Sequence, residues 1–181
     1  MAKADNNVLL NKLSGSIGKQ VTIKQRGGKT IVSKAQQPRE KAATGKQLEA
    51  QDKFTEATAY AKEVLADPDM ATVYRSMAQP GQNAYNIAIR DAYNPPVIEN
   101  IEKAGNIITV RATDDFRVYR VTVAIYSTEG VMLEEGNALM GRNGKDWTYT
   151  ATIATTETGC RLIAMAEDLP GNRTNREIVI A

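Results

Sequence analysis

The sequence contains no histidine and a single cysteine. Without histidine the chain has no Ser-His-Asp triad, no Cys-His dyad and no imidazole ligand for a metal. The lone thiol, Cys160, excludes an internal disulfide and a metal site built from several thiolates. Carboxylate, lysine and tyrosine chemistry remain, so the composition favours a non-enzymatic protein with no cofactor and no small-molecule substrate.

Long apolar runs are missing as well. No stretch reaches the roughly 18 apolar residues of a membrane-spanning helix. The apolar run near the N-terminus, residues 8–10, is shorter than the core of about 7–15 residues in a secretory signal. We therefore expect no signal peptide, no transmembrane segment and no membrane partner, and a protein that stays in the cytoplasm or leaves the cell by another route.

Acidic residues are scarce in the first quarter of the chain. Residues 1–48 hold ten Lys/Arg and two Asp/Glu, a balance of +8. Residues 49–181 hold thirteen Lys/Arg and nineteen Asp/Glu, a balance of −6. A basic segment attached to a mildly acidic body indicates a polyanion or an acidic protein surface as partner.

Residues 19–34 have the pattern of a β-hairpin. Two runs of β-forming residues flank Gly27-Gly28, which supplies the positive φ angles of a two-residue turn. The implied register places Ile23 opposite Val32. A lone hairpin is marginal in water, so this one is expected to pack on another element.

Short helices are predicted after the hairpin, and an extended arm before it. Residues 1–18 are polar and dotted with glycine, which favours the arm. Three apolar-periodic segments separated by proline-containing breaks predict helices over residues 44–66, 69–78 and 83–92. The hairpin and these helices together make up a predicted region 19–94.

From residue 95 the hydrophobic pattern changes to a period of two. The predicted strands lie near residues 97–101, 107–112, 118–125, 131–133, 147–153, 162–166 and 177–180. Their number, length and turn spacing predict a seven-stranded β-sandwich over residues 95–181. The fold class expected for the chain is a two-part α+β arrangement, with a β-hairpin plus short helices followed by the sandwich.

Three motifs in this half resemble a known family. Residues 113–118 (TDDFRV), the strand with Trp147 and Tyr149, and residues 164–172 (AMAEDLPGN) are similar to the recurring pattern of bacterial immunoglobulin-like modules. The resemblance implies an immunoglobulin-like sandwich that serves as a non-catalytic spacer, adhesive or interaction unit. Such modules occur in exported surface proteins and, as single copies, in phage virion proteins. Residues 14–95 resemble an uncharacterised family of small bacterial proteins, which implies no activity.

The basic segment supplies the candidate binding residues. We define the basic docking surface as Lys19, Lys24, Arg26, Lys29, Lys34, Arg39 and Lys41. Its expected partners are other protein subunits, through an acidic surface or in a homo-oligomer. Nucleic acid is an alternative partner, because such cations can neutralise phosphates. Residues 1–48 contain no aromatic side chain, however, so they offer no stacking platform for single strands.

Clustered acidic residues supply a candidate metal site. Asp114, Asp115 and Asp168 start loops expected at one end of the sandwich, where with Asn172 they could hold Ca²⁺. Turn formation explains the same residues, since Asp and Asn side chains bond their own backbone. The carboxylates also leave open a hydrolase pair, for which the sequence shows no cleft-building element.

Aromatic residues and the thiol are best explained by packing. Trp147 is expected in the core of the sandwich or at its rim, and Cys160 is expected to point inward as an inert thiol. Four tyrosines of the helical region are expected in the core with hydroxyls at its edge, an exposed contact surface being the alternative. They are Tyr60, Tyr74, Tyr85 and Tyr93.

Together these patterns predict a non-enzymatic structural or interaction protein. The favoured setting is an accessory subunit of a phage virion or a similar multi-subunit assembly, docked through its basic N-terminal region. A nucleic-acid-associated protein and a surface adhesion module are the alternatives.

Overall fold

The computed structural model describes residues 2–3, 10, 13–38, 42–153 and 158–180. The chain divides into two compact units, Met1–Leu48 and Glu49–Ala181. Among the described residues, no helix combines the length and apolar character that crossing a bilayer requires.

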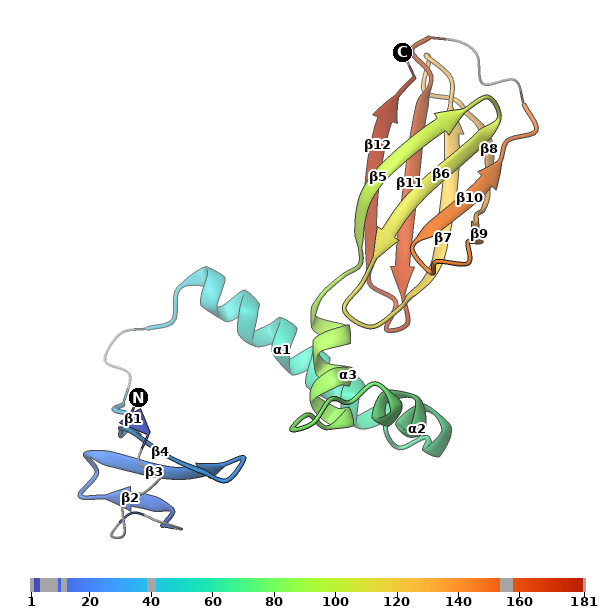
Figure 1. Cartoon of the computed structure of the whole chain (residues 1–181). Helices are drawn as coiled ribbons and strands as arrows, with labels where there is room; N and C mark the ends of the chain where they lie inside the picture. The colour runs from blue at the N-terminus through green and yellow to red at the C-terminus, as the bar shows by residue number, and fades with distance from the viewer. Residues whose placement is uncertain (1, 4–9, 11–12, 39–41, 154–157, 181) are drawn as a thin grey trace. The chain divides into compact units, whose positions relative to one another are not determined.

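The first unit contains a four-stranded antiparallel sheet in the order β1-β4-β3-β2 (Figure 1). Its strands are β1 (Ala2–Lys3), β2 (Gly15–Ile17), β3 (Val21–Arg26) and β4 (Lys29–Lys34). Gly27 and Gly28 have φ angles of 55° and 74°, as a two-residue hairpin turn requires. Ile23 lies opposite Val32, so the predicted register is confirmed. The hairpin is not isolated, because β1 and β2 pair with its two outer edges. Residues 1–18, predicted as an extended arm, supply both of these strands.

Three helices follow this sheet along the chain: α1 (Gly45–Val64), α2 (Pro68–Ser76) and α3 (Ala84–Tyr93). Each start has a local cause. The Thr44 N–H donates to the Gln47 side chain before α1, the Asp67 carboxylate caps α2, and Asn83 caps α3. In the second unit a small core of Ala61, Tyr74, Ile87 and Ala88 joins the helices, and Phe116 and Leu169 from the sheet loops pack against it.

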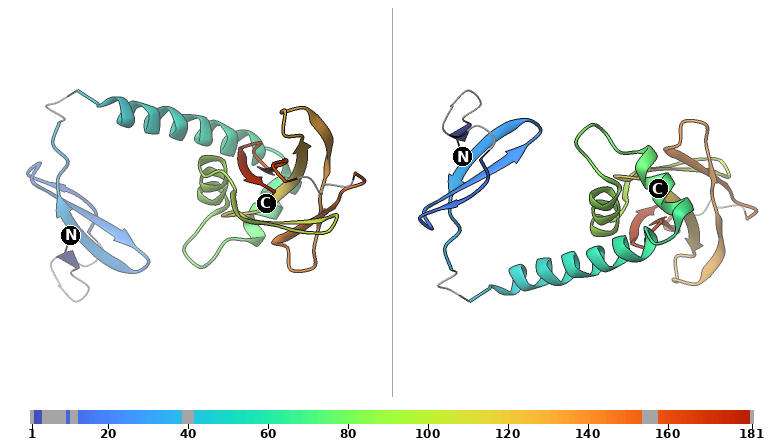
Figure 2. Two further views of the ribbon diagram at one scale, coloured as in Figure 1. Left: turned by 90° about the horizontal axis from the view of Figure 1, so that it is seen from above. Right: turned by 90° about the horizontal axis from the view of Figure 1, so that it is seen from below.

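Two four-stranded antiparallel sheets make up the rest of the second unit, in the orders β5-β6-β10-β9 and β12-β11-β7-β8. The strands of the first are β5 (Val97–Ala104), β6 (Ile107–Thr113), β9 (Leu139–Met140) and β10 (Asp146–Thr150). Those of the second are β7 (Val118–Tyr126), β8 (Met132–Asn137), β11 (Arg161–Asp168) and β12 (Arg173–Val179). Figure 2 views this unit roughly along its strands.

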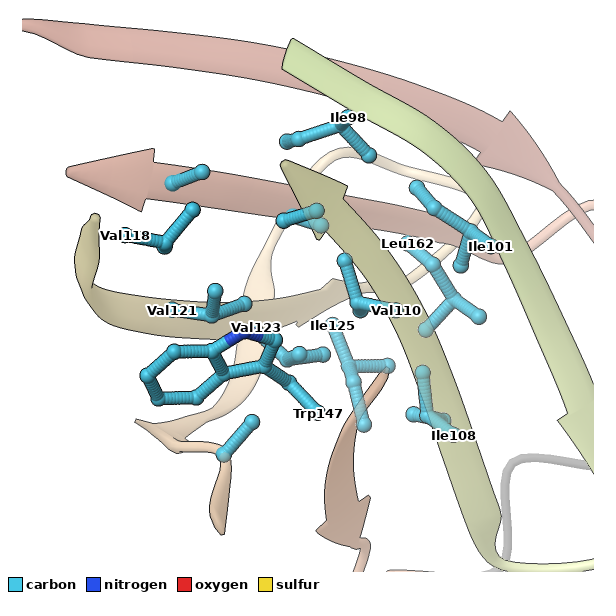
Figure 3. Close-up of a cluster of buried hydrophobic side chains, with 14 of the residues drawn as sticks. Ile98, Ile101, Ile108, Val110, Val118, Val121, Val123, Ile125, Trp147 and Leu162 are labelled. Carbon is cyan, nitrogen blue, oxygen red and sulfur yellow. The ribbon is translucent and has the colours of Figure 1, made fainter. Parts of the chain in front are cut away.

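The two sheets share one apolar core, which makes the unit sandwich-like. Side chains from β5, β6, β7 and β11 point toward one another, and Trp147 of β10 joins them (Figure 3). Trp147 is 6 % exposed, so its predicted place in the core is confirmed. The Cys160 thiol is buried, as expected.

The predicted fold class is wrong in its strand count and sheet number. The described residues form three antiparallel sheets, and those between 95 and 180 form eight strands instead of a seven-stranded immunoglobulin-like sandwich. The error arises at Ala138, which is buried and donates its N–H to the Val121 carbonyl. There the chain leaves β8, which pairs with β7, and enters β9, which pairs with β10 in the other sheet. The predicted strand near residues 131–133 corresponds to β8, and the sequence pattern predicts no strand at β9.

A close contact between β8 and β10 fixes the local packing of this half. Tyr149 lies directly over Gly136, where an added Cβ would come within 2.6 Å of the ring carbon Cε2. The Tyr149 hydroxyl donates to Glu134 Oε1 at 2.6 Å. The backbone N–H groups of Thr152 and Ile153 also donate to the Glu134 carboxylate, at 3.0 Å each. Glu134 therefore holds the chain beyond the end of β10.

The first prediction concerns Gly136. Gly136→Ala forces Tyr149 to move away from Glu134, and we expect it to lower the free energy of unfolding by about 1–3 kcal/mol, as overpacking does. Chemical denaturation of the full chain measures this change. Gly45→Ala is the control, because no atom lies within 4 Å of the Cβ it adds. Equal stability of wild type and Gly136→Ala would contradict the contact.

The second prediction concerns pH. The hydrogen bond from Tyr149, with those from Thr152 and Ile153, lowers the pKa of Glu134 to about 2. A carboxylate whose pKa is lower in the folded state contributes stability above its unfolded pKa of about 4.3, and this contribution is lost as pH falls toward 2. We expect Glu134→Gln to be less stable than wild type at pH 7, with the difference shrinking between pH 5 and about 2.5.

The control for this experiment is the neighbouring residue. The Glu135 side chain is exposed and forms no hydrogen bond or ion pair with the residues that the structure describes. Glu135→Gln should therefore follow the wild-type unfolding curve at every pH. A difference between wild type and Glu134→Gln that is constant with pH would show that the carboxylate charge has no part in this contact.

Candidate functional site

The basic docking surface is positioned by the register of β3 and β4. Lys24 and Arg26 alternate with Gln25, so they project from the same face of the sheet, and Arg26 is paired with Lys29 across the hairpin. Lys24, Arg26 and Lys29 are all exposed. The register therefore gathers three of the predicted cations, defined here as the basic face.

The opposite face of the same sheet is packed. Ile23 and Thr30 are buried there. The Gln25 amide donates to the Leu13 carbonyl at 2.8 Å and to the Thr30 hydroxyl at 3.0 Å, which fastens the preceding segment to this face. The buried side chains of this sheet thus lie on the side opposite the basic face.

The other predicted cations do not join the basic face. Lys34 is paired with Val21, which puts it on the packed side at the end of β4. Lys19 lies in the turn between β2 and β3, where its φ of 55° is left-handed. Arg39 and Lys41 lie outside the described residues.

Charge on the basic face is not neutralised within the described residues. None of the ion pairs among the residues that the structure describes involves Lys24, Arg26 or Lys29. Like charges directly opposite each other in a sheet are destabilising, and Arg26 and Lys29 occupy such positions. An anionic partner would remove this repulsion.

A second candidate site is a cluster of carboxylates in the second unit, defined here as the acidic cluster. Asp91 of α3, Asp114 after β6 and Asp168 at the end of β11 each place a carboxylate oxygen within 4.8 Å of the other two. Two of the predicted residues, Asp114 and Asp168, are therefore brought together.

The third predicted residue, Asp115, points elsewhere. Its carboxylate accepts a hydrogen bond from the Asn94 amide at 2.6 Å and lies 3.7 Å from Arg90. Asp91, and not Asp115, is the third member of the acidic cluster. The sequence contains a pattern that indicates Asp91. Asp91 lies one helical turn after Ile87 and Ala88 on the buried stripe of α3, an unusual position for an acidic residue.

Hydrogen bonds hold each member of the acidic cluster. The Tyr74 hydroxyl donates to Asp91 Oδ2 at 2.6 Å. The Asn172 backbone N–H and side-chain amide donate to the two oxygens of Asp168 at 2.7 and 2.8 Å. The N–H of Arg117 donates to Asp114 Oδ2 at 3.0 Å. One oxygen of Asp91 and one of Asp114, both Oδ1, are buried without a partner.

Burial dominates the electrostatics of this cluster. It raises the pKa of Asp91 to about 7, aided by the charges of Asp114 and Asp168 and opposed by the hydrogen bond from Tyr74. Burial also raises the pKa of Asp168, against the hydrogen bonds from Asn172. Asp91 is 0 % and Asp168 is 1 % exposed, so these two are closed to a substrate. The arrangement suits a proton or a small cation.

The predicted aromatic packing holds in part. Tyr74 is fully buried, stacks on Phe116 with ring centroids 4.6 Å apart, and shares a hydrogen bond of 3.0 Å with the Tyr60 hydroxyl. Tyr85 packs against the same small core. Tyr93 instead lies under the Lys53 ammonium, which is 4.8 Å from its ring centroid.

No protein-family model matches the chain, and no curated protein matches its sequence. Three solved structures show weak likeness. A carbohydrate-binding module family 56 β-1,3-glucan-binding domain is 13% identical over 46% of this chain and 96% of that one, with a TM-score of 0.33. An engineered protein is 17% identical over 57% of this chain and 30% of that one, with a TM-score of 0.34.

The third is a hypothetical protein from Pyrococcus horikoshii OT3, 12% identical over 49% of this chain and 87% of that one, with a TM-score of 0.32. TM-scores this low carry no argument about shared fold or function. The β-rich character predicted for residues 95–181 is confirmed by the strands themselves. The resemblance to immunoglobulin-like modules is supported by no family match.

The third prediction concerns Tyr74. Tyr74→Phe leaves Asp91 Oδ2 buried without its donor, and we expect a loss of about 1–3 kcal/mol in the free energy of unfolding. Tyr60→Phe is the matched control. Its hydroxyl is only partly buried, so water replaces the lost bond and the expected loss is smaller, below about 1 kcal/mol. Equal losses in thermal or chemical unfolding would contradict the special role of the Tyr74 hydroxyl.

Proposed function

We propose that this chain is a non-enzymatic interaction protein that docks onto an acidic protein surface through its basic face. The proposal rests on one observation, the placing of Lys24, Arg26 and Lys29 together on the exposed side of the N-terminal sheet. Three cations on one face of a sheet form a surface that favours a partner of complementary charge.

The second unit is suited to act as the projecting part. Residues 49–181 form a compact unit with an apolar core of their own and a charge balance of −6. Because the second unit carries a net negative charge, it does not compete with the basic face for acidic partners. It also makes a second copy of the chain one acidic surface that the basic face could contact.

An accessory subunit of a multi-subunit assembly is the role that we favour, with a phage virion as the setting. The virion setting depends on the motif resemblance described above, because single modules of that kind occur in virion proteins. Binding to nucleic acid is the competing function, because the same three cations would also attract phosphates.

The fourth prediction tests the docking. The triple variant Lys24→Gln, Arg26→Gln, Lys29→Gln should bind poly-L-glutamate about threefold to a hundredfold more weakly than wild type at low salt, because exposed ion pairs contribute about 0.2–1 kcal/mol each. Wild-type affinity should fall as salt is raised. Fluorescence anisotropy of labelled polyglutamate measures both, and sedimentation velocity at low and high salt measures self-association.

A charge-matched control is available in the second unit. Lys62, Arg142 and Lys145 are exposed, and their side chains form no ion pair or hydrogen bond within the described residues. Changing all three to Gln removes the same three charges and should leave binding unchanged. Equal weakening in both triple variants, or no binding by wild type, would refute docking through the basic face. Tighter binding to duplex DNA than to polyglutamate would replace it with the nucleic-acid function.

A further inference from the structure

The acidic cluster has the composition of a site for a hard cation. Its three carboxylates come from three separate elements: α3, the segment between β6 and β7, and the end of β11. Ca²⁺ binds oxygen at about 2.3–2.6 Å, so ligand oxygens on opposite sides of the ion lie about 4.6–5.2 Å apart. The cluster's oxygens all lie within 4.8 Å of one another, so small side-chain adjustments let them contact a single Ca²⁺.

Unpartnered buried oxygens are the second, independent observation. Asp91 is 0 % exposed, and its Oδ1 has no hydrogen-bond partner. The Oδ1 atom of Asp114 is also buried without a partner. Leaving an ionised oxygen in the interior without a counter-charge is costly. Among the described residues, no lysine or arginine forms an ion pair with Asp91, Asp114 or Asp168.

The oxygens are also positioned in advance. Tyr74 holds Asp91 through Oδ2, and backbone N–H groups hold Asp114 through its Oδ2, so in both residues Oδ1 is the oxygen left for a ligand. The Asn172 amide, which orients Asp168, also donates to the Ala92 carbonyl of α3 at 3.2 Å. Ligand side chains fixed by a supporting shell are typical of metal sites.

We propose that Asp91, Asp114 and Asp168 form a Ca²⁺ site that joins α3 to the sheet loops of the second unit. Asp114 is partly exposed and lines a surface hollow with Asn94 and Pro95, which gives the ion a path of entry. Water entering there completes the six to eight oxygen ligands that Ca²⁺ takes. Mg²⁺ fits less well, because its bonds of about 2.0–2.1 Å demand a tighter octahedron.

The fifth prediction tests this site in the full chain. After treatment with a chelator, the protein is titrated with CaCl2 or MgCl2 and followed by thermal unfolding and calorimetry. We expect Ca²⁺ at about ten times its Kd to raise the Tm by about 5 °C. Asp91→Asn keeps an acceptor for Tyr74 but removes the charge, so we expect at least a tenfold loss of Ca²⁺ affinity. Asp114→Asn is the second variant, with the same expected loss.

Asp115→Asn is the matched control, since Asp115 is the neighbouring carboxylate that bonds Asn94 instead of joining the cluster. It should respond to Ca²⁺ as wild type does. Failure of the wild type to bind Ca²⁺ up to about 10⁻³ M, or an equal response of wild type and Asp91→Asn, would overturn the site. An equal response to Mg²⁺ and Ca²⁺ would overturn its assignment to calcium.

Discussion

The second unit depends on the way in which it accommodates buried negative charge. Asp91 and Asp168 are almost completely shielded from solvent, yet no ion pair of the described residues reaches either of them. Hydrogen bonds from Tyr74 and Asn172 take up part of the cost. The bond from Tyr74 joins α2 to α3, and the Asn172 amide that orients Asp168 also donates to the Ala92 carbonyl of α3, so it fastens the sheet loop to the helix. These polar contacts add to the small apolar core in which Phe116 and Leu169 pack against the helices.

Charge is distributed differently in the first unit. There the cations face outward on one side of the sheet, while Ile23, Thr30 and the Gln25 amide pack the other side. Exposed charge of one sign contributes nothing to the stability of a small sheet, and between Arg26 and Lys29 it works against it. The two units therefore place charge differently: the first exposes cations on one face of its sheet, and the second buries carboxylates.

Local signals were sufficient to predict the hairpin and the helices. Gly27-Gly28 selects a two-residue turn, and that turn alone fixes the pairing of Ile23 with Val32. The capping pattern at Thr44 and Gln47 and the prolines after each helix determined three helices close to their observed bounds. Each of these features depends on residues within a few positions of one another.

Features that depend on distant residues were missed. The strand pairs of β1 and β2 involve short polar segments with no alternation, and the passage between sheets at Ala138 depends on a hydrogen bond to Val121. At the acidic cluster, adjacent Asp114 and Asp115 carry the same chemistry, and their separate destinations are decided by Arg90 and Asn94 about twenty residues away. The apolar periodicity of α3 predicts its buried stripe from residues such as Ile87 and Ala88, so it does not identify Asp91 as part of that stripe.

The crossing of the chain from β8 to β9 at Ala138 also determines the edge of the β5-β6-β10-β9 sheet. It leaves β9 as an edge strand of two residues, Leu139 and Met140, although Leu139 is 79 % exposed and apolar. An edge strand of two residues offers an incoming strand very few free N–H and C=O groups. Extension of this sheet by strand addition is therefore disfavoured. Two copies of the protein that meet at this edge therefore do not extend their sheets into a continuous fibre.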